Sequence, residues 1–238
     1  MREHLNSDES PTIQAKDPVI SARGLTRIFG SGSTSVVAVN DISLDIMPGE
    51  TLAFMGRSGS GKTTLLNLLS GLDRPTSGDV FFQGNDLASL DESGLVELRR
   101  HKISFIFQSF GLMPLLSAQE NVELPLHLSG LGWRERRRRA QEALELVGLR
   151  SRARHRPYEL SGGEQQRTSI ARALVTGSEV MFADEPTGEL DTTTAAMIAT
   201  ILRDISSKQG TTVLIATHDP TLASGANRTL ELVDGALV

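Results

Sequence analysis

The sequence predicts an α/β fold with a parallel β-sheet at its core. Three apolar runs carry this prediction, at 51–55, 180–183 and 211–217, and each ends at a glycine-rich, acidic or histidine-bearing segment. Buried parallel strands form such continuous runs, and ligands bind at their carboxyl ends. We therefore expect the functional residues to lie where these runs end.

The first run leads into a phosphate-binding loop. Residues 56–63 match the pattern G-x-x-x-x-G-K-[ST], and an apolar helix pattern follows at 64–72. Lys62 can reach the β- and γ-phosphates of a nucleotide, and the Thr63 hydroxyl can bind Mg²⁺. A chance Gly/Ser-rich turn is the alternative, but the strand and helix patterns on either side favour the phosphate site. The predicted contacts to the nucleotide are Gly56, Arg57, Ser58, Gly59, Ser60, Gly61, Lys62, Thr63 and Thr64.

A second segment predicts a helix that begins at an anion site. Ser161 to Glu164 form the capping-box pattern S-x-x-E, which on its own indicates only a well-made helix start. Gly162 and Gly163 are unfavourable in a first turn, by roughly 1 kcal/mol each relative to Ala. They do leave backbone N–H groups open to an anion.

Together, the phosphate loop and the Leu-Ser-Gly-Gly-Glu segment at 160–164 resemble the ATP-binding cassette (ABC) ATPases, the nucleotide-binding subunits of transporters. The resemblance covers about residues 19–238. It implies a P-loop NTPase fold of ABC type, with a RecA-like parallel-sheet core, an antiparallel β subdomain and an α-helical lobe. It also implies ATP and Mg²⁺ as ligands and a head-to-tail homodimer, in which Ser161, Gly162, Gly163 and Glu164 contact the γ-phosphate of ATP held by the other subunit.

The same resemblance assigns roles to five residues outside these segments. Asp184 would order the Mg²⁺ shell with Thr63, and Glu185 would polarise the attacking water. His218 would contact the γ-phosphate, and Gln108 would sense both Mg²⁺ and the γ-phosphate. Lys62, Gln108, Glu185 and His218 form the implied catalytic set, and Phe29 falls where the family stacks an aromatic ring on adenine. The acids Asp184 and Glu185 have an ordinary alternative, a strand that ends at a solvated turn. For His218 the alternative is a structural or exposed histidine, and for Phe29 it is a core residue of its strand.

One segment departs from the family pattern. Residues 188–191 stand at its D-loop, where relatives usually carry Asn in place of Glu189. A carboxylate there adds negative charge near the implied dimer seam, while Asp191 is retained.

The remaining segments predict how the chain is organised. Residues 1–18 are polar, lack the apolar segment of a signal peptide and predict a flexible tail. Short strands at 19–20, 36–39, 42–46 and 80–82 predict the antiparallel sheet. The segment from about 110 to 160 is predicted to form the helical lobe, with a helix at 134–147. A later helix is predicted to begin at Asp191 and end at Gly210.

Composition excludes several classes of protein. The net charge of −5 gives no indication of a nucleic-acid partner, and the absence of cysteine excludes disulfides. No run approaches the ~20 apolar residues of a membrane-spanning helix. Together with these observations, the resemblance to ABC ATPases implies a peripheral protein at the cytoplasmic face of the membrane, which contacts the membrane through its partner.

Residues 107–114 and 118–126, with Arg156-Pro157, are similar to the lipoprotein-release and macrolide-export branch. That similarity implies a transmembrane permease subunit as partner and an export-type function. A non-transport soluble ABC ATPase is the alternative. The DNA-repair class of such ATPases inserts a long coiled coil between the phosphate loop and the Leu-Ser-Gly-Gly-Glu segment, and the 99 positions from Lys62 to Ser161 leave no room for it.

The basic cluster Arg134 to Arg139 has two interpretations. A solvated helix face is favoured, since charge runs are usually solvated, and contact with anionic lipid headgroups is the alternative.

Overall fold

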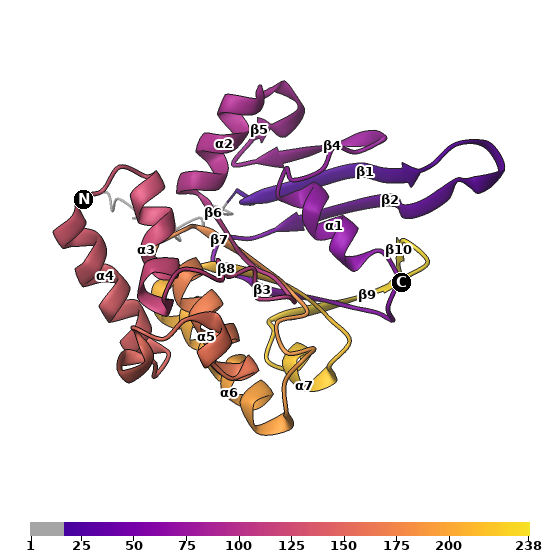
Figure 1. Ribbon diagram of the computed structural model, residues 1–238. Helices are drawn as coiled ribbons and strands as arrows, with labels where there is room; N and C mark the ends of the chain where they lie inside the picture. Colours follow the sequence, from indigo (N-terminus) through magenta and orange to yellow (C-terminus); the bar gives the residue numbers. More distant parts are fainter. Residues whose placement is uncertain (1–16) are drawn as a thin grey trace, which may run out of the picture.

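The structure, a computed structural model, describes residues 17–238 (Figure 1). The first sixteen residues of the predicted flexible tail lie outside the described residues. Two sheets, flanked by helices, make up the described chain. Within it, no helix has the length and apolarity that a membrane crossing requires.

The antiparallel sheet contains four strands in the order β2-β1-β4-β5. These are β1 (Ile20–Phe29), β2 (Val36–Ile46), β4 (Ser77–Phe82) and β5 (Asn85–Asp86). The sequence predicted two short strands at 36–39 and 42–46, whereas the structure has one long strand there. The chain passes through Asp41 at a φ of 50°, and register shifts in the facing strand β1 absorb the irregularity without ending the ladder.

The core sheet has the strand order β10-β9-β3-β8-β7-β6. Its strands pair in parallel, except that β10 is antiparallel to β9. The strands are β3 (Thr51–Met55), β6 (Ile103–Ile106), β7 (Val180–Asp184), β8 (Thr212–Thr217), β9 (Arg228–Val233) and β10 (Ala236–Leu237). The predicted parallel core is therefore confirmed, and β3, β7 and β8 lie side by side at its centre.

Seven α-helices surround the sheets within the described residues: α1 (Lys62–Leu69), α2 (Glu92–His101), α3 (Ala118–Leu128), α4 (Trp133–Leu146), α5 (Gly162–Leu174), α6 (Thr192–Gln209) and α7 (Pro220–Ala223). Helix α1 ends three residues before the predicted end, because Gly71 leaves the helical conformation at a φ of 68°. Helix α6 has the predicted ends: Asp191 caps it through the N–H groups of Thr193 and Thr194, and Gly210 ends it. Helices α3, α4 and α5 pack together at one side of the molecule (Figure 1).

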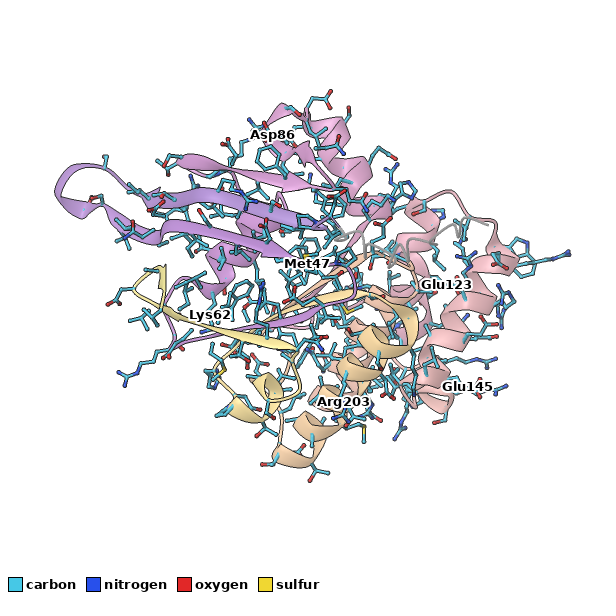
Figure 2. All side chains as sticks on the ribbon, turned by 180° about the vertical axis from the view of Figure 1, so that it is seen from behind. Met47, Lys62, Asp86, Glu123, Glu145 and Arg203 are labelled. Carbon is cyan, nitrogen blue, oxygen red and sulfur yellow. The ribbon has the colours of Figure 1, made fainter. Side chains whose placement is uncertain are left out.

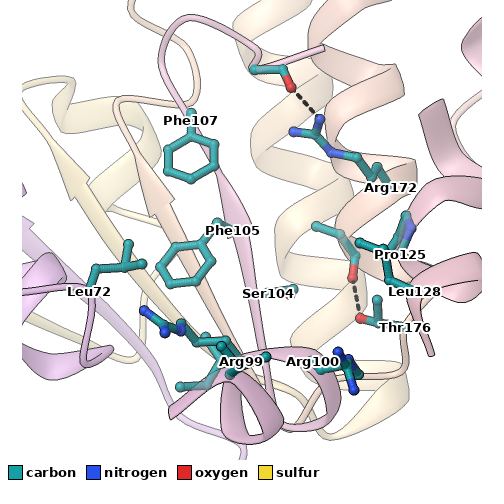
Figure 3. Close-up of a pocket in the computed structure, with 14 residues that line it drawn as sticks. Leu72, Arg99, Arg100, Ser104, Phe105, Phe107, Pro125, Leu128, Arg172 and Thr176 are labelled. Carbon is teal, nitrogen blue, oxygen red and sulfur yellow. Dashed lines mark hydrogen bonds between the residues drawn. The ribbon is translucent and has the colours of Figure 1, made fainter. Parts of the chain in front are cut away.

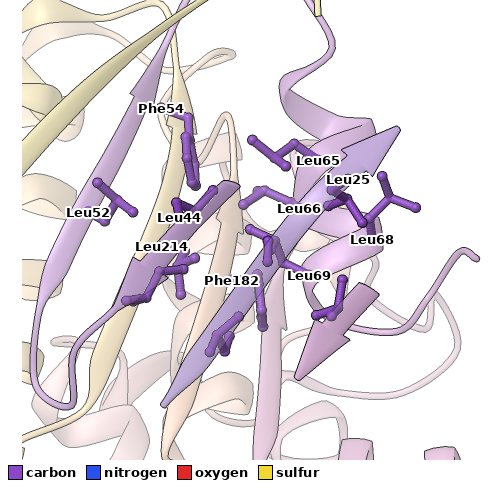
Figure 4. Close-up of a cluster of buried hydrophobic side chains, with 14 of the residues drawn as sticks. Leu25, Leu44, Leu52, Phe54, Leu65, Leu66, Leu68, Leu69, Phe182 and Leu214 are labelled. Carbon is purple, nitrogen blue, oxygen red and sulfur yellow. The ribbon is translucent and has the colours of Figure 1, made fainter. Parts of the chain in front are cut away.

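The two faces of the core sheet have different partners. Phe182 and Leu214 pack with the leucines of α1 and with strands of the antiparallel sheet (Figure 4). Met181 and Val213, the preceding residues of the same strands, pack with residues of α3 to α6. Because successive side chains of a strand point to opposite faces, α1 and α5 cover opposite faces of the core sheet. This separates the phosphate loop from the segment at 161–164 within one chain.

Candidate active site

The loop at 56–63 follows β3 and opens α1, as the sequence predicts. Gly61 has a φ of 102°, and a Cβ atom built there would lie 2.1 Å from the backbone oxygen of Ala38. A Cβ atom at Gly56 would lie 2.4 Å from the oxygen of Leu232. The loop therefore presses against β2 and β9, and only glycine fits at both positions.

Lys62 is buried inside this loop, as the first residue of α1 (Figure 2). Its Nζ atom donates to the backbone oxygens of Gly56 at 2.8 Å and Arg57 at 3.1 Å. It also lies 3.3 Å from Oε1 of Glu185, which follows β7. The buried Ser60 hydroxyl has no hydrogen-bond partner among the described residues. The loop thus holds one buried cation and one unsatisfied hydroxyl, both of which suit a phosphate ligand.

Asp184 stands at the carboxyl end of β7, opposite the first turn of α1. The Thr63 hydroxyl donates to its two carboxylate oxygens at 2.9 and 3.1 Å. Burial raises the pKa of Asp184 and the negative charge of Glu185 adds to the rise, while the bond from Thr63 opposes it. These oxygen atoms are the hard ligands that Mg²⁺ prefers, so this residue pair fits the predicted metal.

Glu185 lies between Lys62 and His218. Its Oε2 atom lies 2.9 Å from Nδ1 of His218 and accepts a bond from the His218 backbone N–H at 3.3 Å. Its own N–H donates to the oxygen of Ala216 in β8, at a φ of 43° that few non-glycine residues adopt. Since β7 and β8 pair directly, the structure brings together an acid and a histidine that lie 33 positions apart.

Gln108 and Phe29 lie nearer the edges of the site. Gln108 follows β6, and its Nε2 atom lies 3.6 Å from a Cβ atom built at Gly188, in the turn after Glu185. Phe29 ends β1 and is 42% exposed, so it is not a core residue. The Arg27 guanidinium stacks 4.6 Å above its ring.

The segment 161–164 forms the predicted capping box at the start of α5. Ser161 Oγ accepts from the Glu164 N–H at 3.3 Å, and Glu164 accepts from the Ser161 N–H at 2.9 Å. That backbone bond lowers the pKa of Glu164, and Arg152 at 3.0 Å acts in the same direction. A Cβ atom at Gly163 would lie 2.7 Å from Cγ2 of Thr194, so close packing against α6 also requires this glycine.

The sequence analysis missed one connection between α5 and the acidic pair. Gln166 is fully buried, and its amide donates to the oxygen of Pro186 at 2.8 Å, directly after Glu185. A glutamine on the apolar side of a helix was the available signal, because a buried amide needs a partner.

Comparison with known proteins agrees with this arrangement. The sequence profile described as "ABC transporter" matches residues 39–188. The chain belongs to this family. It is an ATPase cassette of the kind that ABC transporters couple to transport, and the predicted ABC-type fold is confirmed.

Two curated relatives are named "Macrolide export ATP-binding/permease protein MacB". The one from Marinobacter nauticus is 47% identical over 221 residues, which are 93% of this chain and 34% of the relative. The one from Rhodopseudomonas palustris (strain HaA2) is 50% identical over 219 residues, which are 92% of this chain and 33% of the relative. The chain thus spans about a third of the length of the curated relatives it matches.

A solved structure is similar over nearly its whole length. It is the dimeric, post-hydrolysis state of the ATP-binding cassette MJ0796 bound to ADP and Pi. Its TM-score is 0.86 at 40% identity, and the match covers 92% of this chain and 96% of that one.

Proposed function

We propose that the chain binds ATP at the loop 56–63, hydrolyses it with Glu185 and His218, and thereby powers export or extracytoplasmic work by a transmembrane permease. The observation that carries this proposal is the contact series from Lys62 through Glu185 to His218, with Asp184 and Thr63 beside it. These groups come from the carboxyl ends of three neighbouring strands. The named relatives are export proteins, and the similar solved cassette holds ADP and Pi.

The site residues divide the chemistry between them. Lys62 and the loop N–H groups stabilise the charge that develops on the transferred phosphoryl group. Glu185 orients and polarises the attacking water, and His218 holds the Glu185 carboxylate in place through its Nδ1 contact. Thr63, Asp184 and Gln108 would hold Mg²⁺, which neutralises phosphate charge when bound. Phe29 offers the adenine an exposed aromatic face.

Replacement of Glu185 tests this assignment. Glu185→Gln removes the base-type assistance, which is worth ~10²–10⁴ in rate, so hydrolysis should fall by that factor while ATP still binds. Glu145→Gln is the matched control, because Glu145 lies on the exposed side of α4 (Figure 2). Turnover and ATP affinity are measured for both variants, and near-normal turnover of Glu185→Gln would refute the role.

The solved dimer of the similar cassette and the separation of α1 from α5 support a head-to-tail homodimer. In such a dimer, residues 161–164 of one subunit would reach the ATP of the other. We propose this arrangement for the chain, at the cytoplasmic face of the membrane.

A cavity of about 490 Å³ lies between β6 and the helices α3 and α5 (Figure 3). Apolar side chains line it, among them Phe105, Phe107 and Leu128, together with Arg99 and Arg100. The cavity lies beside Gln108. A segment of the permease bound there would therefore sense whether the site holds ATP or its hydrolysis products.

Affinity purification from detergent-solubilised membranes should recover a polytopic membrane protein with the wild-type chain. A Leu128→Asp variant should recover less of it, and a non-transport soluble ATPase would recover none.

A further inference from the structure

Arg172 is a partly buried cation on α5 to which the ATP chemistry above gives no role. Its guanidinium donates to the backbone oxygen of Gly111, to that of Phe110 at 3.0 Å and to Ser169 Oγ at 3.3 Å. Figure 3 shows the bond to Gly111 beside the cavity. Burial lowers the pKa of Arg172, and no ion pair within residues 17–238 includes it. Among the described residues, backbone and hydroxyl oxygens therefore supply its hydrogen-bond partners.

The two carbonyl groups that Arg172 binds belong to a turn with an unfavourable backbone conformation. Phe110 has a φ of 61° and Gly111 a φ of 59°. A bulky residue with a positive φ is rare and persists only where its surroundings hold it. The planar fork of a guanidinium can bind two successive carbonyl oxygens at once, which a lysine ammonium cannot do in the same geometry.

This turn lies between two parts of the proposed ATP site. At one end, the Gln108 amide lies 3.6 Å from a Cβ atom built at Gly188, in the turn after Glu185. At the other end, the Phe110 ring lies 3.8 Å from a Cβ atom built at Gly162, the first residue of α5. The segment 108–111 therefore lies next to both the acidic turn and the start of the anion-site helix.

We propose that Arg172 is a positioning residue that fixes the segment 108–111 onto α5. Through this contact, Gln108 and the residues Gly162 and Gly163 keep one relative placement during ATP hydrolysis. Arg172 acts through Gln108 and does not itself contact the nucleotide. The inference rests on the proposed ATPase function.

Kinetics of the full chain test the proposal first. Arg172→Gln should lower kcat on the order of 10- to 100-fold, the scale of a small misplacement of a reacting group, while KM stays near the wild-type value. The control is Arg203→Gln, since Arg203 is exposed on α6 (Figure 2) and should not affect kcat.

A double variant separates positioning from a general loss of structure. If Arg172 acts through Gln108, the variant Arg172→Gln/Gln108→Ala should hydrolyse ATP no more slowly than Gln108→Ala alone. Losses that multiply would show that Arg172 acts elsewhere and would overturn the inference.

Amide hydrogen exchange gives a readout that does not depend on activity. Arg172→Gln should raise exchange at 108–113 and leave it unchanged at 118–128, since only the first segment loses its anchor. Unchanged exchange at 108–113 would also overturn the inference.

If Arg172→Gln does not fold, Arg172→Lys can replace it in both the kinetic and the exchange measurements. Lysine keeps the positive charge but lacks the planar guanidinium that binds two carbonyl oxygens. A wild-type chain that does not hydrolyse ATP would refute the proposed function, whereas the exchange comparison would still decide whether Arg172 holds the turn.

Discussion

Single charged residues within the site depend on one another because the fold removes them from water. Lys62 is 5% exposed and the Glu185 side chain 12% exposed, at 3.3 Å from each other. Glu185 also faces His218, and the neighbouring Asp184 carboxylate accepts a hydrogen bond from the Thr63 hydroxyl. A buried charge is stable only where it is paired or hydrogen-bonded. Removal of any one of these groups would therefore leave its partner's charge uncompensated.

Lys62→Ala should weaken ATP binding by the isolated chain. A hydrogen bond to a charged group contributes about 1.5–3 kcal/mol, which corresponds to roughly 10- to 150-fold in Kd. Lys208→Ala is the control, since that lysine pairs with Asp204 on an exposed face of α6. Titration calorimetry measures the ATP affinity of both variants. Equal affinities of Lys62→Ala and Lys208→Ala would show that Lys62 does not contribute to ATP binding.

Among the helices, α5 combines a stable start with functional contacts. Its capping box satisfies backbone groups at the first turn, its Gly163 packs against α6, and its Gln166 holds the turn after Glu185. The element is therefore both a packing unit of the helical lobe and a link to the turn that carries Asp184 and Glu185.

The charge of Glu164 should make the stability of the chain dependent on pH. Its pKa in the folded chain lies below the usual glutamate value of 4.5, chiefly because of the hydrogen bond from the Ser161 backbone N–H. The stabilisation is therefore present above about 4.5 and is lost as pH falls through the folded pKa. Glu164→Gln keeps the capping acceptor but loses the charge, so it should be less stable at pH 7 by about 0.3–1 kcal/mol.

Urea unfolding at pH 7 and at acidic pH measures this effect. The difference between Glu164→Gln and the wild type should shrink at the acidic pH. Glu145→Gln, which removes an exposed ion pair with Arg150, should change stability by less than about 0.5 kcal/mol at either pH. A Glu164→Gln deficit that is the same at both pH values would contradict the assigned cause.

For the whole molecule, the proposed head-to-tail dimer assigns the loop before α1 and the start of α5 to different steps. Ser161→Arg or Gly163→Asp should leave ATP binding by the monomer intact and should block dimer closure and hydrolysis. Lys62→Ala should already weaken binding by the monomer. Size-exclusion chromatography and nucleotide titration at low protein concentration distinguish the two effects. An equal loss of monomer affinity in the Ser161 and Gly163 variants would exclude the trans arrangement.

Two of the five arginines in the basic cluster form ion pairs with glutamates of the same helix, α4. Arg138 pairs with Glu135 and Glu142, and Arg139 also pairs with Glu135, whose pKa these bonds lower to about 2. Arg136 donates to the oxygen of Leu131. These contacts favour the solvated helix face over a lipid anchor.

The isolated chain should therefore bind anionic vesicles weakly, and the binding should disappear as salt rises, since screening acts over roughly 8 Å at physiological salt. Replacing Arg136 to Arg139 with glutamine should leave ATP hydrolysis unchanged. Vesicle sedimentation at low and high salt provides the measurement. Salt-resistant binding to protein-free vesicles would instead make the cluster a membrane anchor.

Local sequence patterns determined several elements of this protein. Continuous apolar runs specify buried parallel strands, and the spacing of glycines around Lys62 specifies the loop, because backbone geometry and burial act over a few residues. Capping residues such as Asp191 and Ser161 specified helix ends for the same reason. The order of motifs along the chain was enough to indicate the family.

The contacts between distant segments were decided by the tertiary structure alone. The pairing of β7 with β8 sets Glu185 against His218, and the packing of β7 beside α1 sets Asp184 against Thr63. Likewise, Arg172 binds carbonyl groups 61 and 62 positions earlier in the chain. No local pattern encodes such contacts, because they depend on strand order, on register and on which face of the sheet each helix covers.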